Sequence, residues 1–269
     1  MIMNKNMRPQ LAEKKFHDFF EAWMCQLEEY ANLLKREIST PDHQHHCDEQ
    51  GNNCKALINK MTQHHKDFYT AKWAGAHEDV LAFFNPIWLT PLETAFSWMT
   101  GWKPSTFFRV VNSLHKTGQS PPSPGPAAEL TDQQLQRIES LRVRIRLEED
   151  KVEREMERQQ VSMADPKFVE LTRLVGLIRS GDRPMSPDVD LMVSAALKGL
   201  LNGLETVIKM ADCVRLKTLK GILDVLNPIQ SLEFLAASAL LLVQMRKLGK
   251  KHMENSLITN HQTEFRDDT

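Results

Sequence analysis

The first group of residues with the chemistry of a binding site lies in a polar segment between residues 39 and 54 of this 269-residue chain. Its potential metal ligands are three histidines and two cysteines: His43, His45, His46, Cys47 and Cys54. Structural zinc sites take paired ligands about two to four residues apart, but these cysteines are seven positions apart. We therefore interpret the segment as a flexible, solvated loop without a specific metal site, and a zinc site is the alternative.

A second group with acid–base character is His77, Glu78 and Asp79. It does not match the His-Glu-x-x-His zinc motif, and no nucleophile can be paired with it. Elsewhere the sequence has no Gly-rich phosphate loop, no metal quartet and no nucleophile–base pair. We therefore expect no catalytic residues, no metal, no cofactor and no enzymatic activity.

Composition favours a protein of a reducing, intracellular compartment. The net charge is −1, which gives no basic field for nucleic acid, and the four cysteines are scattered rather than arranged as a disulfide framework. The first ten residues contain no apolar signal core. The most apolar run, 234–243, is too short to span a bilayer, so we expect no integral membrane segment and leave peripheral association open.

The elements that must position any site are helices, because apolar stripes of helical period are frequent and strand-like alternation is almost absent. We expect an all-α fold: an antiparallel helical bundle with one long charged central helix and a Pro-rich linker. The long helix covers 131–164 and contains neither Gly nor Pro. Thr131 and Gln134 form a capping box at its start, and Asp165-Pro166 ends it. Its apolar edge is interrupted near Glu148, so we expect it to lie against the bundle rather than form a simple coiled coil.

Turn residues and apolar stripes divide the rest of the chain. We expect further helices at 11–37, 55–84, 91–99, 106–114, 166–178, 187–227 and 228–248. The expected domain organisation is a flexible N-terminus (1–10), a helical domain (11–248) and a polar tail (249–269). The helical domain has an N-terminal half (11–116), a linker (117–130), and the long helix with the C-terminal half (131–248).

Three motifs in order resemble the plant delay-of-germination (DOG) domain. They are FHDFF followed by Trp23, WLTPLE at 88–93, and SWMTGWKPS at 97–105. The run MADCVRLKTL at 210–219 resembles the same domain in TGACG-motif-binding bZIP factors. The resemblance covers about 14–248 and implies structural signature roles for Phe16, Phe20, Trp23, Trp88, Pro91, Glu93, Trp98, Gly101, Trp102 and Pro104.

Within this family, the long helix at 142–160 and the run 209–228 most resemble the members that form pollen apertures, the sites where exine is not deposited. The resemblance implies a non-enzymatic adaptor or scaffold that contacts other proteins or a second copy of itself. It also implies a location in cytoplasm and nucleus, with peripheral association at plasma-membrane domains. On the long helix, the candidate partner-binding residues are Arg142, Arg144, Arg146, Glu149, Arg154 and Arg158.

Two other functions stay open. Resemblance to the bZIP factors implies a transcriptional regulator that binds DNA or a DNA-bound partner. Only fifteen residues precede Phe16, and they carry no basic region and zipper, so direct DNA binding is not expected. The tryptophans between residues 73 and 102 allow a third reading, a small-ligand sensor with an aromatic-lined cleft between helices.

Overall fold

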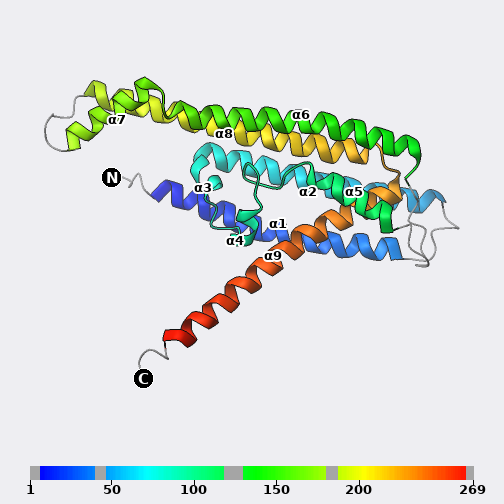
Figure 1. Ribbon diagram of the computed structural model, residues 1–269. Coiled ribbons are helices and arrows are strands. Elements are labelled where there is room, and N and C mark those ends of the chain that lie inside the picture. Colours follow the sequence, from blue (N-terminus) through cyan, green and yellow to red (C-terminus); the bar gives the residue numbers. More distant parts are fainter. Residues whose placement is uncertain (1–6, 40–46, 118–129, 180–186, 265–269) are drawn as a thin grey trace.

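The computed structural model describes residues 7–39, 47–117, 130–179 and 187–264. These residues form helices and no strand, which confirms the all-α prediction (Figure 1). The helices are α1 (Met7–Ser39), α2 (Cys47–Glu78), α3 (Val80–Phe84), α4 (Pro91–Ala95), α5 (Thr106–Thr117), α6 (Asp132–Ser162), α7 (Pro166–Arg179), α8 (Pro187–Leu223) and α9 (Pro228–Glu264).

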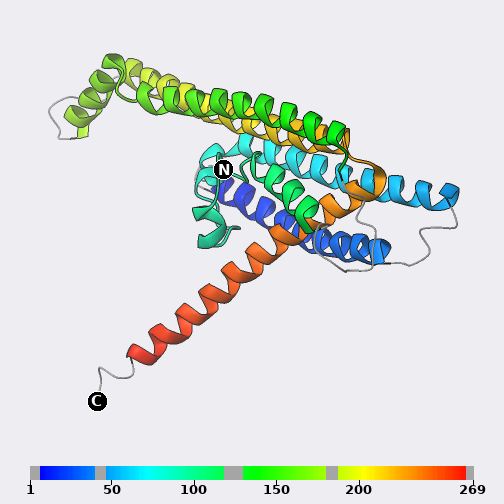
Figure 2. The same ribbon diagram turned by 45° about the vertical axis from the view of Figure 1, so that its right-hand side comes forward.

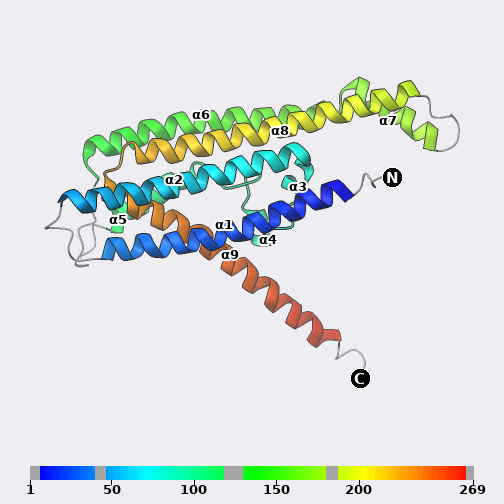
Figure 3. The same cartoon turned by 180° about the vertical axis from the view of Figure 1, so that it is seen from behind.

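Two groups of helices pack on each other to form the body. In the first, α1, α2 and the first half of α9 contact one another, and α4 and α5 pack on α9. In the second, α6 and α8 lie side by side, as all three views show (Figure 1, Figure 2 and Figure 3). Helix α2 contacts α8 and so joins the two groups.

The apolar stripes explain this packing. Phe16, Phe20, Trp23 and Leu27 recur at helical spacing on α1, and all four are buried. On α6 the predicted apolar edge faces inward, so the charged helix lies against the bundle. Its buried residues include Ile138, Leu141, Ile145 and Val152. Its start is also as predicted: the Thr131 hydroxyl accepts a hydrogen bond from the Gln134 amide at 3.2 Å, and the Gln134 side chain accepts one from the Thr131 amide at 3.0 Å.

Several predicted boundaries differ from the structure. Helix α2 begins at Cys47, so the loop interpretation is wrong for 47–53, while 40–46 lies outside the described residues. A Gly costs an α-helix only about 1 kcal/mol relative to Ala, which tertiary packing readily offsets. The predicted helix 55–84 is two helices, because the Asp79 side chain caps α3 by accepting from the Leu81 amide at 3.1 Å. Helix α4 ends at Ala95 rather than 99, because a tight turn follows at 98–101.

Two parts extend beyond the body. Helices α7 and α8 pack on each other as a hairpin, and α7 with the first turns of α8 projects past α3 (Figure 1). Helix α9 leaves the bundle and projects alone toward the C-terminus (Figure 3). The predicted end of this helix near residue 248 is therefore wrong, since α9 continues to Glu264. The predicted linker lies almost entirely outside the described residues, at 118–129.

Two of the described helices, α8 and α9, are long and apolar enough to cross a membrane by length and composition alone. Buried core helices pass the same test, and half of the apolar window of α9 is buried in the body. The apolar window of α8 is only 11% buried. Most residues of that window are therefore half-buried or exposed, although α8 packs on α6 and α7.

Candidate functional site

An apolar cavity of about 150 Å³ lies where α1, α2, the 83–102 segment, α8 and α9 meet. Several of the predicted signature residues line it, although they come from three separate motifs. They are Phe16, Phe20, Trp23, Trp88, Glu93, Gly101 and Trp102. The signature residues Pro91, Trp98 and Pro104 do not line the cavity but shape the segments around it.

Aromatic rings form one wall of the cavity. The ring of Phe16 meets Phe83 and Trp88 edge-on, with centroid separations of 4.7 and 4.8 Å. Trp23 stacks on His64 at 4.8 Å, and its indole N–H donates to the His64 carbonyl at 3.0 Å. Edge-to-face pairs such as those of Phe16 contribute about 0.5–1.5 kcal/mol beyond the burial of the rings, so they favour this arrangement.

A buried ionic cluster lies at one end of the cavity. The Asp212 carboxylate of α8 accepts from Lys72 Nζ at 2.9 Å, from Trp73 Nε1 at 3.0 Å and from Arg215 Nη1 at 2.5 Å. The side chains of Lys72, Asp212 and Arg215 are each at most 3% exposed. Two buried cations therefore share one buried carboxylate.

Arg215 also fixes the turn that carries the Gly-Trp-Lys-Pro-Ser motif. Its guanidinium donates to the carbonyls of Trp98, Met99 and Trp102, the last two at 3.0 and 2.8 Å. Met99 and Thr100 have positive φ angles of 44° and 64°, which non-glycine residues rarely adopt. A Cβ at Gly101 would lie 3.0 Å from the guanidinium carbon, so only glycine lets the arginine approach this closely.

Burial shifts the pKa values of groups that face the cavity. Burial lowers the pKa of Lys72 to about 8, against the opposing effect of Asp212. Burial lowers the pKa of His65 to about 4, so this imidazole is neutral at physiological pH. Burial raises the pKa of Tyr69 far above its usual value, so the phenol is neutral as well.

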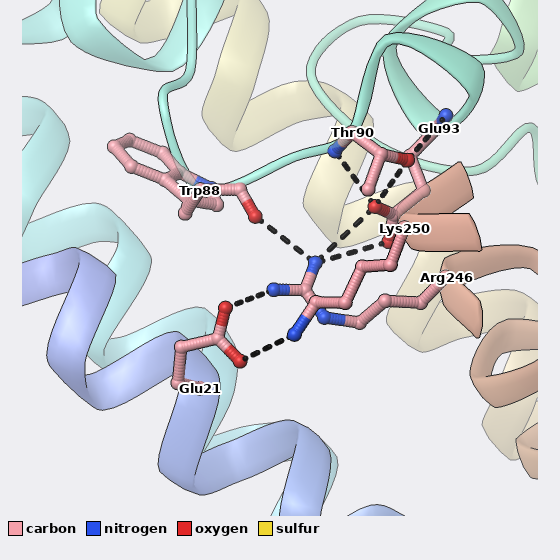
Figure 4. Close-up of polar contacts among 6 residues, drawn as sticks. All are labelled: Glu21, Trp88, Thr90, Glu93, Arg246 and Lys250. Atoms are coloured by element: carbon pink, nitrogen blue, oxygen red, sulfur yellow. Dashed lines mark hydrogen bonds and ion pairs between the residues drawn. The ribbon is translucent and has the colours of Figure 1, made fainter. Parts of the chain in front are cut away.

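A second cluster, centred on Arg246 of α9, explains the Trp-Leu-Thr-Pro-Leu-Glu motif (Figure 4). Arg246 Nη1 donates to the Trp88 carbonyl at 3.0 Å and pairs with Glu93 at 3.2 Å, while Nη2 pairs with Glu21 of α1. Glu93 also accepts from the Thr90 amide at 2.8 Å and so completes the capping box of α4. One guanidinium thus holds α1, α4 and α9 together.

The predicted partner-binding residues of α6 do not all share one face. Arg144, Arg146, Arg154 and Arg158 are exposed, and Arg142 is half-buried and pairs with Glu139 at 2.7 Å. Glu149 is buried instead, where it accepts from the Ser105 amide at 2.6 Å. Its role is therefore to hold the signature turn against α6, and it is not on the exposed face.

The acid–base group at 77–79 has structural roles in the described residues. His77 pairs with Glu205 at 3.2 Å on the surface, and Asp79 caps α3. Within the part of the chain that the structure covers, no three His, Cys, Asp or Glu side chains are grouped to hold a metal ion. The histidines at 43, 45 and 46 lie outside that part.

Sequence reasoning missed the central cations Lys72, Arg215 and Arg246, and Asp212 as well. One signal could have found two of them: Asp212 and Arg215 lie in the apolar stripe of α8, between Ile208 and Leu219. A charged residue on a buried stripe needs a buried partner, which points to an ionic cluster. No sequence signal identifies Lys72 as that partner, 140 positions away.

Comparison with known proteins agrees with the motifs. The DOG1 profile, described as "Seed dormancy control", matches residues 36–113. Protein DOG1-like 4 of Arabidopsis thaliana is 48% identical over 246 residues, which cover 90% of this chain and 94% of that protein. Transcription factor TGA2.3 of Oryza sativa subsp. japonica is 27% identical, over 67% of this chain and 49% of its own length. The TGACG-sequence-specific DNA-binding protein TGA-2.1 of Nicotiana tabacum is 26% identical, over 81% and 42% respectively.

Proposed function

This chain belongs to the DOG1 family of plant proteins, and from that premise we propose that it is a non-enzymatic adaptor that acts by binding other proteins. The polar side chains of the candidate site serve structural roles: Asp212 neutralises cations, Glu93 caps a helix and Glu149 holds a turn. None of them is paired with a nucleophile in the described residues, which favours binding over catalysis.

The observation that carries this proposal is the exposed apolar surface of the α7–α8 hairpin. Leu191, Met192 and Leu197 of α8 are 70%, 57% and 50% exposed, and Val169 of α7 is 52% exposed. Large apolar side chains that gather in exposed positions on one projecting element suit a contact with another molecule. The hairpin projects from the body, where a partner can reach it (Figure 2).

The outer face of α6 offers a second contact surface of different chemistry. Val143 and Leu147 are exposed one turn apart, and Arg144 and Arg146 flank them. An apolar pair with arginines at its edge suits a partner helix that carries acidic side chains. Each exposed charge pair contributes only about 0.2–1 kcal/mol, so several arginines must act together.

We propose pollen aperture formation as the process in which the adaptor acts, at plasma-membrane domains where exine is not deposited. The support is the resemblance of 142–160 and 209–228 to the aperture-forming members of the family, and α6 and α8, which contain most of these two segments, pack on each other. The proposed location is cytoplasm and nucleus, with peripheral membrane association at aperture sites. A fluorescent fusion in tetrad-stage microspores should gather in discrete membrane patches, and a diffuse or wholly nuclear signal would contradict this role.

The binding surface is tested by substituting Leu191, Met192 and Leu197 together with serine. Partner recovery from anther extracts with the tagged full chain should fall at least tenfold, because the apolar contact is lost. The matched control replaces three exposed apolar residues of other helices and loops, Leu33, Leu81 and Ile87, with serine and should keep recovery unchanged. Equal recovery with both variants would refute the assignment of the hairpin.

A second candidate is transcriptional regulation through DNA or a DNA-bound partner. The similarity to TGA2.3 and TGA-2.1 supports it, because their names describe a transcription factor and a DNA-binding protein. A mobility-shift assay with TGACG-containing DNA tests the direct route. A third candidate is a small-ligand sensor, which the aromatic-lined cavity favours.

A further inference from the structure

We propose that the cavity binds a compact aromatic carboxylic acid, with its ring among the aromatic side chains and its carboxylate beside Lys72 and Arg215. This inference names the ligand of the sensor candidate and rests on that candidate, not on the adaptor function. Both cations line the cavity, Lys72 from α2 and Arg215 from α8.

The size and lining of the cavity fit one small ring system. A volume of about 150 Å³ is comparable to an apolar cavity that holds benzene. The lining is mostly apolar, and Phe16, Trp88 and Phe83 present ring edges and faces to each other and to the cavity. A flat ring gains both burial and edge-to-face contacts there, whereas a long acyl chain exceeds the volume.

The charge of the site selects an anion. Aromatic cages commonly bind organic cations, but two buried cations already stand at the end of this one. Asp212 neutralises only one of Lys72 and Arg215, so one positive charge is uncompensated. His65 and Tyr69 line the same cavity and are neutral. Buried charge needs a partner, and a ligand carboxylate supplies it.

The other end of the cavity does not compete for this anion. Glu93 is the acidic residue that lines the cavity, and its carboxylate is occupied by Arg246 and by the Thr90 amide and hydroxyl. The cluster of Arg246 and Lys250 with Glu21 and Glu93 is balanced in charge. The uncompensated charge is therefore confined to the end with Lys72.

Two hydrogen-bond donors, on Lys72 and Thr100, belong to residues that line the cavity beside the proposed carboxylate position. The Lys72 ammonium has three N–H groups and uses two of them, for Asp212 and for the Thr100 carbonyl at 3.1 Å. Thr100 lines the cavity, and its hydroxyl is buried without a hydrogen-bond partner among the described residues. Unsatisfied buried polar groups are costly, and a bound carboxylate would accept from both.

The proposal is tested by titrating the purified full chain with benzoate and 2-naphthoate, followed by calorimetry and by the fluorescence of the tryptophans that line the cavity. We expect saturable one-to-one binding of at least one acid. The neutral amides of the same rings should bind at least tenfold more weakly, and benzyltrimethylammonium should not bind. An amide or the cation binding as tightly as the acid, or palmitate binding in place of both acids, would overturn the ligand class but keep a sensor. Binding of none of these probes would remove the sensor candidate as well.

Variants locate the site. Lys72→Met should weaken acid binding at least tenfold and amide binding much less, because only the acid also loses its charge partner. Ser97→Trp should block the cavity, which Ser97 lines, while Ala95→Trp, exposed on α4 and outside the lining, is the matched control. If Lys72→Met does not fold by circular dichroism, Thr100→Val replaces it, with a smaller loss of about threefold or more expected. Unchanged acid binding by Ser97→Trp would refute the placement.

Discussion

Arg215 and Asp212 lie one turn apart on α8 and meet at 2.5 Å between Nη1 and Oδ1. The Asp212 carboxylate also forms an ion pair with Lys72 of α2. The Arg215 guanidinium also donates hydrogen bonds to carbonyls of the 98–102 turn. One intrahelical ion pair therefore joins two helices and a turn that are far apart in sequence. The ion pair stabilises the fold because it neutralises charges that are buried in the folded protein.

Replacing Asp212 with asparagine should strongly destabilise the fold. The substitution leaves Lys72 and Arg215 buried without a counter-charge, which typically costs about 3–5 kcal/mol. Urea unfolding followed by circular dichroism measures the loss. The control Asp190→Asn removes an exposed carboxylate from the same helix and should change the free energy of unfolding by no more than about 0.5 kcal/mol.

Replacing two helical glycines with alanine should change stability in opposite directions. A Cβ at Gly249 would lie 2.1 Å from the Thr90 hydroxyl oxygen, in the capping box beside the Arg246 cluster, so Gly249→Ala should lower the melting temperature. A Cβ at Gly199 would meet nothing within 4 Å, so Gly199→Ala should stabilise by up to about 1 kcal/mol through helix propensity. Thermal unfolding of the two variants in parallel checks both signs, and a shift in the same direction would contradict the packing at Thr90.

Glu149→Ala should loosen the signature turn from α6. The carboxylate accepts from the Ser105 amide, and a buried donor left without an acceptor costs about 1–3 kcal/mol. Amide hydrogen exchange at 103–107 should accelerate along with the loss of stability. Asp150→Ala, one position on but exposed, is the control and should leave exchange there unchanged.

His65 should make stability sensitive to acid. Its pKa in the folded state is depressed to about 4 from 6.5, so the unfolded chain binds the proton more tightly. The stability that this residue contributes is complete above about pH 6.5 and is lost as pH falls through about 4, by roughly 3 kcal/mol at that pH. Urea unfolding at pH 7 and pH 4.5 should show a smaller difference for His65→Leu than for the unsubstituted protein, and an equal difference would exclude His65 as the cause.

Local sequence patterns predicted where most helices lie, but they did not predict several helix boundaries. The capping box of Thr131 and Gln134 placed the start of α6 because both partners lie within one turn. The stripe from Phe16 to Leu27 was recognisable for the same reason. In contrast, 47–53 looks like a loop by composition and is helical, and 249–264 looks like a tail and continues α9, because neither segment contains a proline to end its helix.

The candidate site was less predictable than the fold. The signature motifs identified most of the cavity wall, but the charged residues behind it meet across large sequence separations: 140 positions for Lys72 and Asp212, and 153 for Arg246 and Glu93. No spacing rule connects such pairs. Only the burial of each charge, known from the fold, requires that a partner exists.

Helix α9 connects the cavity wall to a projecting helical arm without a break. Leu242 and Met245 lie in the cavity wall, Arg246 is held by α1 and α4, and the same unbroken helix then leaves the bundle. From Met245 to Glu264 the arm is about 28 Å long, so a tilt of about 5° at the cavity would move its tip by about 2.5 Å. A small change in how the cavity is filled would thus displace the far end of α9 without any change in secondary structure.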